Sequence, residues 1–483
     1  MLTDLYQLTM ASAYLKAGVA ETEACFHLYF RSNPFSGGYS VACGLAQALE
    51  YLDHLSFSED DVSYLATLTG ADSKPLFGTS FLDWLRAFRF DGDVLAVPEG
   101  TVVFPGEPLL RVTGPIATCQ IVETALLNII NFQTLVATKA ARVVMAAGGD
   151  PVLEFGLRRA QGPDGGLSAG RAAYVGGCAG TSNVLTGQRY GVPVGGTHAH
   201  SLVMLFDTEM EAFRAYAEAM PNNAVLLVDT YDTLEGVRNA IKAGGRLREL
   251  GSDLIGIRID SGDLAWLSIR ARELLDAAGF EATRIYASNE LDEYTIESLK
   301  DQGARIDVWG VGTKLVTAYD QPALGGVYKL SAVREPGGEW EPRVKVSEQA
   351  VKVTTPGLLQ VRRFSDESGR FVGDMVYDEL VPPGEHCTMV DPADAIRRSS
   401  YCPTYPSEDL LVRVCSGGTV VYDVPPIADS RERAREQLSH LDPSHQRLLN
   451  PHTYKVGMEL GLYDRKTALI LAARGFASDE GGR

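Results

Sequence analysis

The chain has 483 residues, of which 45% are hydrophobic and 22% are charged, as in ordinary globular proteins. Its 62 acidic and 44 basic residues give a formal net charge of −18, which disfavours nucleic acid and anionic membranes as partners. No apolar run approaches the ~20 residues that span a bilayer, and the first residues do not read as a secretory signal. Seven scattered cysteines without a C-x-x-C pair fit neither a disulfide framework nor a zinc ribbon. We therefore expect a cytoplasmic protein of two or three domains with reduced thiols.

The predicted elements divide the chain into three parts. Residues 1–120 mix helical sequence with strand-and-turn sequence, such as 92–100, and predict a mixed α+β N-terminal domain. Residues 121–330 contain a repeated strand-then-helix pattern, which predicts parallel strands joined by helical crossovers. Residues 331–483 combine extended runs with two charged helical segments near 431–441 and 466–474, and predict a smaller C-terminal domain. The apolar strands of the middle part are predicted at 151–155, 192–195, 224–228, 254–259, 284–287 and 306–309, and its helices at 172–190, 201–219, 233–250, 264–278 and 292–302.

Small and polar residues follow each of these predicted strands. In barrels and open α/β sheets, the carboxyl ends of the strands carry the chemistry. Any one such cluster is also what a turn or a helix cap requires. Six in succession favour a functional site; they lie at 155–158, 196–197, 229–230, 260–263, 288–290 and 310–313.

The segment 195–201, with the sequence G-G-T-H-A-H-S, is the most informative of these turns. A histidine where a strand leads into a helix lies near free backbone N–H groups, which favour anions. His198 and His200 also form an H-x-H pattern that some barrel enzymes use for a metal, although the other six histidines lie outside the predicted strands. The surrounding residues 151–206 are locally basic, with Arg158, Arg159, Arg171 and Arg189 against Glu154 and Asp164.

Several familiar signatures are missing from the sequence. It contains no G-x-x-x-x-G-K-[ST] loop, no G-x-G-x-x-G after a strand and no G-x-S-x-G turn. These observations argue against P-loop, dinucleotide-binding and serine-hydrolase chemistry.

Five motifs, taken together and in order, resemble the nicotinate phosphoribosyltransferase family. They are T-D-L-Y-Q at 3–7, F-G-L-R-R-A-Q-G-P-D-G-G at 155–166, G-T-H-A-H-S at 196–201, R-I-D-S-G-D-L at 258–264 and L-G-G-V-Y-K-L at 324–330. The resemblance implies an α/β fold with an irregular (β/α) barrel of the type II phosphoribosyltransferase kind. It also implies the first step of NAD salvage from nicotinate, in which nicotinate and phosphoribosyl pyrophosphate give nicotinate mononucleotide and pyrophosphate. The family couples this transfer to ATP hydrolysis and uses Mg²⁺.

The residue types at the strand ends suit this reaction. A pyridine nitrogen is already a nucleophile, so the enzyme must chiefly orient the ring and stabilise the charge on leaving pyrophosphate. Arginine forks at Arg158, Arg159 and Arg258 suit phosphate oxygens. Asp260 suits ribose hydroxyls or a magnesium shell, with Asp229 as a second candidate. Backbone N–H groups that cradle the 5′-phosphate are expected at Gly310, Gly312, Thr313, Gly325 and Gly326, for which tight turns are the alternative explanation.

Further roles follow from the resemblance alone. His200 corresponds to the histidine that ATP phosphorylates, while His198 lies where the family varies and is expected to be incidental. Tyr6 corresponds to an aromatic residue that stacks on nicotinate across a homodimer interface, so that the N-terminal domain completes the partner's active site. Phe155 is expected on the opposite face of the ring, or in the core.

Two residues bear on the choice between acid and amide substrates. Thr197 corresponds to a residue that contacts the nicotinate carboxylate. Nicotinamide-using relatives place an acidic residue near 182–183, where this chain has neutral Asn183, which favours the acid. The alternatives are a nicotinamide-type enzyme, a quinolinate-type enzyme that needs further cations but no ATP, and a catalytically idle relative that binds or signals.

Overall fold

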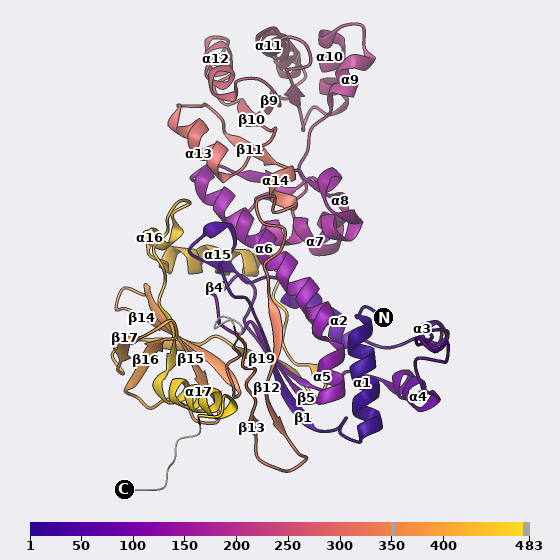
Figure 1. Ribbon diagram of the computed structural model, residues 1–483. Coiled ribbons are helices and arrows are strands. Elements are labelled where there is room, and N and C mark those ends of the chain that lie inside the picture. Colours follow the sequence, from indigo (N-terminus) through magenta and orange to yellow (C-terminus); the bar gives the residue numbers. More distant parts are fainter. Residues whose placement is uncertain (349–352, 477–483) are drawn as a thin grey trace. The chain divides into compact units, whose positions relative to one another are not determined.

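The computed structural model describes residues 1–348 and 353–476, and the chain forms two compact units (Figure 1). Unit 1 comprises Met1–Thr134, Ala323–Pro426 and Arg433–Arg483, and unit 2 comprises Leu135–Pro322 and Ile427–Glu432. The segments predicted as separate domains, 1–120 and 331–483, therefore contribute to one unit. The physical reason is that strands from both segments pair within the same sheet.

Unit 2 is built on a six-stranded sheet in which every neighbouring pair of strands is parallel. Five of the six predicted strands form within it. The predicted strand near 306–309 pairs with the one near 151–155, so the strands follow chain order around an incomplete barrel. An isolated bridge between Thr181 and Val194 stands where the sequence predicts a strand at 192–195. The sheet order is β7 (Gly180–Thr181), β6 (Val152–Glu154), β11 (Val308–Val311), β10 (Arg284–Ala287), β9 (Gly256–Ile259) and β8 (Val225–Leu227).

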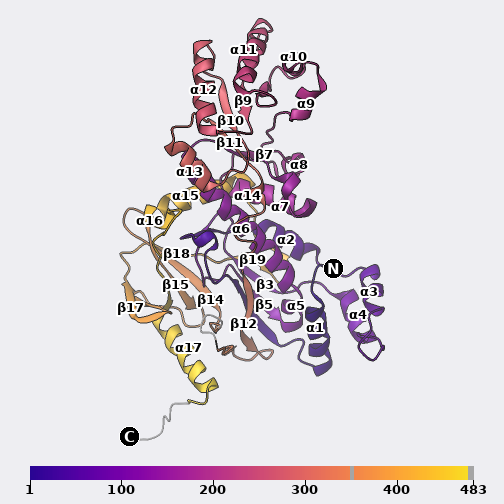
Figure 2. The ribbon, with the colours of Figure 1, turned by 45° about the horizontal axis from the view of Figure 1, so that its top comes forward.

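Helices connect these strands, and Figure 2 shows α12 (Leu264–Ala277) and α13 (Glu293–Asp301) beside β9, β10 and β11. Asp232, Asp263 and Asp292 accept hydrogen bonds from backbone N–H groups in the first turns of α11, α12 and α13. These aspartates are therefore helix caps, the alternative explanation for polar residues after a strand. The helices of this unit are η2 (Leu157–Arg159), α7 (Gly162–Val175), α8 (Val184–Tyr190), α9 (His200–Leu205), α10 (Glu209–Ala219), α11 (Thr233–Glu249), α12 (Leu264–Ala277), α13 (Glu293–Asp301) and α14 (Thr313–Val316).

Two of the predicted helices are each divided in the structure. The predicted helix 172–190 stops at Gly176, because Gly177 adopts a left-handed conformation with φ of 112°, and α8 begins after the cap Asn183. The predicted helix 201–219 is split into α9 and α10, because Thr208 forms a capping box that starts a new helix.

Unit 1 contains two larger sheets and one short pair of strands, β2 (Ser40–Val41) with β4 (Val102–Val103). The first sheet has the order β13 (Glu341–Pro342), β12 (Val327–Arg334), β1 (Glu23–Tyr29), β5 (Leu110–Pro115), β3 (Asp93–Ala96), β19 (Val412–Ser416) and β20 (Thr419–Val420). The second has the order β17 (Asp394–Tyr401), β16 (Cys387–Asp391), β21 (Val456–Glu459), β15 (Phe371–Asp378), β14 (Leu359–Ser365) and β18 (Ser407–Asp409).

Helices surround these sheets, and two of them, α6 (Glu123–Ala147) and α15 (Ile427–His440), contribute residues to both units. The others in unit 1 are α1 (Leu5–Ala17), η1 (Pro34–Ser36), α2 (Leu45–His54), α3 (Glu59–Ala66), α4 (Thr79–Ala87), α5 (Ile116–Ile121), α16 (Pro443–Gln446) and α17 (Leu460–Ala473). Within the described residues, no helix is both long and apolar enough to cross a membrane. The seven cysteines carry free thiols.

A fully buried polar cluster lies in unit 1. Arg363 pairs with Asp374 on the neighbouring strand, and Tyr454 donates its hydroxyl to the same carboxylate at 2.9 Å. Burial and the nearby Asp374 raise the pKa of Glu107 well above its usual range. Protonated Glu107 has a donor for Asp374, while its other oxygen accepts from the backbone N–H of Phe104 at 2.8 Å.

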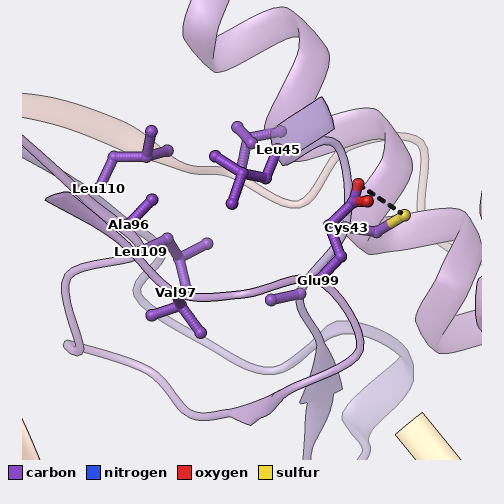
Figure 3. Close-up of a pocket in the computed structure, with 9 residues that line it drawn as sticks. Cys43, Leu45, Ala96, Val97, Glu99, Leu109 and Leu110 are labelled. Atoms are coloured by element: carbon purple, nitrogen blue, oxygen red, sulfur yellow. Dashed lines mark hydrogen bonds between the residues drawn. The ribbon is translucent and has the colours of Figure 1, made fainter. Parts of the chain in front are cut away.

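A second buried feature of unit 1 is the packing around Cys43 and Glu99 (Figure 3). The Cys43 thiol lies 3.8 Å from the carboxylate of Glu99, which also accepts from the backbone N–H of Gly44 at 2.7 Å. Together with apolar side chains such as Leu45 and Leu110, they line a cavity of about 10 Å³, no larger than one water molecule. This region is therefore core, not a ligand pocket.

Candidate functional site

The carboxyl ends of β8, β9 and β10 bring a set of polar side chains together in unit 2. Asp229 follows β8, Asp260 follows β9 and Ser288 follows β10, while His200 is the first residue of α9. Parallel strands place their carboxyl ends at one edge of the sheet, and for this reason residues far apart in the sequence meet here. Three of the polar clusters singled out in the sequence, at 229–230, 260–263 and 288–290, therefore meet at this edge.

His200 lies between a hydroxyl and two carboxylates. Its Nδ1 is 3.1 Å from the hydroxyl of Thr230, and its Nε2 is 3.8 Å from Oδ2 of Asp260 and 3.9 Å from Oδ1 of Asp229. The imidazole is 38% exposed, so it is open to a ligand. The arrangement suits an imidazole that gains positive charge, because both carboxylates would then stabilise it.

Only one of the two carboxylate oxygens of Asp229 is hydrogen-bonded within the fold. Its side chain is 1% exposed, and its Oδ2 accepts from the backbone N–H of Asp260 at 2.9 Å and from the Ser261 hydroxyl at 2.6 Å. Its Oδ1 has no hydrogen-bond partner among the described residues. A buried acceptor without a partner beside His200 and Asp260 is ready for a cation or a protonated imidazole.

Arg258 joins the strand ends to one another. Its Nε donates to Ser288 at 2.8 Å, one terminal nitrogen to Thr197 at 3.2 Å and the other to Asp260 at 3.1 Å. A guanidinium has five N–H donors, so two remain for a ligand. Arg258 thus places a cation, a hydroxyl and a carboxylate in one network, as a site for an anionic substrate requires.

The ring of Phe155 packs beside this network. It lies at the end of β6, with the guanidinium of Arg258 5.6 Å from its centroid. Gly310 on β11 makes room for it, since a Cβ at Gly310 would lie 2.7 Å from a ring atom of Phe155. The fold therefore fixes one side of this half-buried ring. Stacking of the ring on nicotinate stays a prediction.

His198 has a structural role. Its Nε2 accepts from the backbone N–H of Leu227 on the edge strand β8 at 3.1 Å, and its Nδ1 lies 3.3 Å from the carbonyl of Ala199. Burial lowers its pKa, and its ring packs 4.8 Å from that of Tyr216. Both nitrogens are thus engaged, and no group of three or more His, Cys, Asp or Glu side chains suited to a metal occurs among the described residues.

The structure places Asn183 in a buried capping position. Its side-chain oxygen accepts from the backbone N–H groups of Leu185 and Thr186, and its amide nitrogen donates to Gly166 at 3.4 Å. Its side chain is thus engaged within the fold. A role for Asn183 in substrate choice stays a prediction, which rests on its lack of charge.

The predicted phosphate-binding residues of unit 2 lie on short helices at the same strand ends. Arg158 and Arg159 are exposed on η2, directly after Phe155. Gly312 is the residue before α14, and Thr313 begins that helix. Their position fits a phosphate ligand, and their binding role stays a prediction.

Three predicted site residues belong to unit 1. Tyr6 on α1 is 46% exposed, and partial burial raises its pKa. Gly325 adopts a left-handed φ of 77°, and a Cβ at Gly326 would lie 2.0 Å from the side-chain oxygen of Asn131. Turn geometry and close packing account for both glycines, so their phosphate role, like that of Tyr6, remains a prediction.

Sequence reasoning did not assign roles to several residues of this network. Thr230 and Ser288 fall inside the polar clusters, but hydroxyls are too common at strand ends to single them out. Glu154 ends β6 with its side chain fully buried, and burial raises its pKa. A lone acidic residue beside the F-G-L-R-R motif carries no signal of burial in the sequence.

Known proteins match nearly the whole chain. The nicotinate phosphoribosyltransferase (NAPRTase) family model matches residues 151–341, and the N-terminal and C-terminal domain models of nicotinate phosphoribosyltransferase match 1–131 and 359–466. A nicotinate phosphoribosyltransferase of Bacillus subtilis (strain 168) is 43% identical over 474 residues, which cover 97% of this chain and 94% of that protein.

Solved structures agree with these matches. The crystal structure of human nicotinic acid phosphoribosyltransferase has a TM-score of 0.85 and 34% identity, and the match covers 97% of this chain and 100% of that one. A nicotinate-nucleotide pyrophosphorylase from Pyrococcus furiosus has a TM-score of 0.69 at 24% identity over 91% of this chain and 95% of its own, which shows the fold alone. The predicted α/β fold with an irregular barrel of the type II phosphoribosyltransferase kind is confirmed, and the chain belongs to the nicotinate phosphoribosyltransferase family.

Proposed function

We propose that this nicotinate phosphoribosyltransferase of NAD salvage couples its reaction to ATP hydrolysis through phosphorylation of His200. Nicotinate and phosphoribosyl pyrophosphate are converted to nicotinate mononucleotide and pyrophosphate, while ATP and water give ADP and phosphate. The observation that carries the proposal is the position of the His200 imidazole, between the Thr230 hydroxyl and the carboxylates of Asp229 and Asp260.

The carboxylates determine how the imidazole reacts. They favour a proton on Nε2, so the lone pair resides on Nδ1, which becomes the nucleophile. Nδ1 attacks the terminal phosphorus of ATP, an N–P bond forms, and the P–O bond to ADP breaks. The ring becomes positively charged, which Asp229 and Asp260 stabilise. Water later cleaves the N–P bond and releases phosphate.

The transfer step needs orientation of the ring more than proton transfer. The pyridine nitrogen attacks C1′ of the ribose as the C1′–O bond to pyrophosphate breaks. Phe155 forms one face of the ring site, and Tyr6 of the partner subunit forms the other in a homodimer, consistent with its exposure on α1. Thr197, which Arg258 holds at 3.2 Å, contacts the nicotinate carboxylate.

Phosphate oxygens are bound by the cations and backbone N–H groups at the strand ends. Arg158, Arg159 and Arg258 supply charge. Backbone N–H groups at Gly312 and Thr313 supply further donors, and Gly325 and Gly326, before β12 in unit 1, are the other predicted donors.

Mg²⁺ fits the carboxylate side of the site. Oδ2 of Asp260 is a hard oxygen ligand of the kind this ion prefers, and substrate phosphate oxygens would complete its coordination, while the buried Oδ1 of Asp229 faces Nε2 of His200. Bound there, Mg²⁺ would neutralise phosphate charge.

Substrate choice follows from charge. The neutral Asn183 avoids repulsion of the nicotinate carboxylate, whereas an amide-selective site would place an acidic residue near it. Quinolinate carries a second carboxylate and would require further cations. A cytoplasmic location completes the proposal, and the free thiols support it.

The experiment is an assay of pyrophosphate release by the purified protein with nicotinate, nicotinamide or quinolinate, each with and without ATP and Mg²⁺. We expect turnover with nicotinate and stimulation by ATP. Turnover of quinolinate in preference to nicotinate, or no turnover of any of the three, would contradict the proposal.

A further inference from the structure

Glu154 is a buried carboxylate at the site that the mechanism above does not use. It is the last residue of β6, and its side chain has no exposed surface. One carboxylate oxygen accepts from the Thr181 hydroxyl at 2.5 Å, and the other accepts from the backbone N–H of Gly156. Both donating groups are uncharged, so the carboxylate is held by hydrogen bonds alone.

These two bonds connect the strand ends that carry the predicted ring-binding residues. Gly156 directly follows Phe155, so its N–H fixes the turn that presents the aromatic ring. Thr181 ends β7, and its hydroxyl also accepts from the backbone N–H of Asn183 at 3.0 Å. A relay therefore runs from Asn183 through Thr181 to Glu154 and on to the Phe155 turn.

The backbone holds β6 through three residue pairs with β11 on one side and through a shorter pairing with β7 on the other. β7 has only two residues, and β6 pairs with it at Leu153–Gly180 and Glu154–Thr181. Beyond this pair, the next strand is reduced to the isolated bridge at Val194. The side chain of Glu154 thus adds one hydrogen bond to the short β6–β7 pair, through Thr181, and one to the turn after β6, through Gly156.

We propose that Glu154 is a positioning residue for nicotinate, which acts through Thr181 and Gly156 to fix the Phe155 ring and the Asn183 segment. The proposal rests on the assignment of this chain as a nicotinate-specific enzyme. Because Glu154 is fully buried, it does not touch the substrate. It therefore sets the affinity for the ring, while the phosphate-binding residues and His200 are left in place.

The chemistry of an amide shows why glutamine cannot replace it. Two donors converge on the two oxygens of Glu154, whereas glutamine offers one oxygen and one NH₂ group. Gly156 can only donate, so the glutamine oxygen faces it and the NH₂ group faces Thr181. The Thr181 oxygen can accept from both that group and the N–H of Asn183, but its own O–H loses the acceptor that Glu154 provides, and the relay is broken.

The test compares Glu154→Gln and Thr181→Val with the wild-type enzyme in steady-state kinetics for both substrates. We expect KM for nicotinate to rise by about tenfold or more, the effect of losing one or two hydrogen bonds to a charged group. KM for phosphoribosyl pyrophosphate should stay within about twofold of the wild-type value, because both variants keep an acceptor for the Gly156 N–H and so leave the turn into η2, with Arg158 and Arg159, held as in the wild type. Phosphorylation of His200 by ATP should also be retained.

The matched control is Thr283→Val. Thr283 is a buried threonine of the same unit, and its hydroxyl donates to the carbonyl of Leu254 at 2.9 Å, before β9 and β10 begin. This variant should lower the melting temperature without a selective change in KM for nicotinate. Glu154→Asp, which is shorter by one methylene group, provides a second variant if Glu154→Gln does not fold.

The outcomes separate the two proposals. Suppose that the wild-type enzyme turns over nicotinate but the Glu154 and Thr181 variants raise KM for nicotinate and KM for phosphoribosyl pyrophosphate equally. Glu154 is then structural and the inference is wrong. The same conclusion follows if these variants only lower kcat in proportion to their loss of stability, as Thr283→Val does. If the wild-type enzyme does not use nicotinate, the proposed function fails first.

Discussion

Replacing Arg258 by lysine keeps the positive charge but removes the planar fork that joins three side chains at the strand ends. Arg258 donates to Ser288, Thr197 and Asp260, and its side chain is only 15% exposed. A lysine ammonium on this backbone retains at most one of the three bonds. Two lost hydrogen bonds cost about 2 kcal/mol, which corresponds to roughly 30-fold in kcat/KM if the displaced groups bind the transition state.

The assay is steady-state pyrophosphate release with nicotinate and phosphoribosyl pyrophosphate, for Arg258→Lys beside Arg272→Lys. Arg272 is a matched control, because it is 12% exposed and bonds to Asp276 and to the carbonyls of Thr283 and Phe280, away from the strand ends. Both variants should lose similar stability, whereas only Arg258→Lys should lose kcat/KM. A change below about threefold in Arg258→Lys, or an equal loss in both variants, would refute the role given to the fork.

Three further predictions concern single residues. Gly310→Ala places a Cβ 2.7 Å from the Phe155 ring, so we expect KM for nicotinate to rise several-fold while KM for phosphoribosyl pyrophosphate is unchanged in the same kinetic assay. His198→Phe removes the acceptor for an edge-strand N–H and should cost about 1–3 kcal/mol in urea unfolding, whereas His198→Gln, which can still accept, should cost less. The raised pKa of Glu107 means that the folded state retains a proton on this side chain. Its contribution to the free energy of unfolding is therefore full below about pH 4.5 and is lost as the pH rises toward the folded pKa. Glu107→Gln, which is neutral and can donate to Asp374, should match the wild type near that pH and exceed its stability in urea unfolding near pH 8.

The central sheet was predictable because its pattern is local. Apolar runs followed by polar turns recur along 151–313, and parallel strands must gather those turns at one edge. Asp229, Asp260 and His200 meet for this reason. The H-x-H pattern could not distinguish a structural histidine from a reactive one, since the difference lies in the partners of each ring: the β8 backbone for His198, and carboxylates for His200.

Other features depend on contacts that a sequence does not display. The predicted strand 192–195 is only a bridge, because its single paired residue, Val194, meets a two-residue strand. The pairing of β1 with β12 and of β3 with β19 joins the two ends of the chain in one sheet, which no local pattern indicates. The burial of Glu154 likewise follows from packing at the strand ends, and an isolated acidic residue would ordinarily be assigned to the surface.

The most direct test of the account is incubation of wild-type and His200→Ala enzymes with ATP labelled in its terminal phosphate. We expect the wild-type enzyme to gain acid-labile, alkali-stable label, the behaviour of a phosphohistidine. The variant should gain none, and should form nicotinate mononucleotide slowly and without stimulation by ATP. Label that persists in His200→Ala would contradict the phosphorylation of this residue. An equal loss of coupled and uncoupled synthesis would show that His200 acts directly in the transfer step.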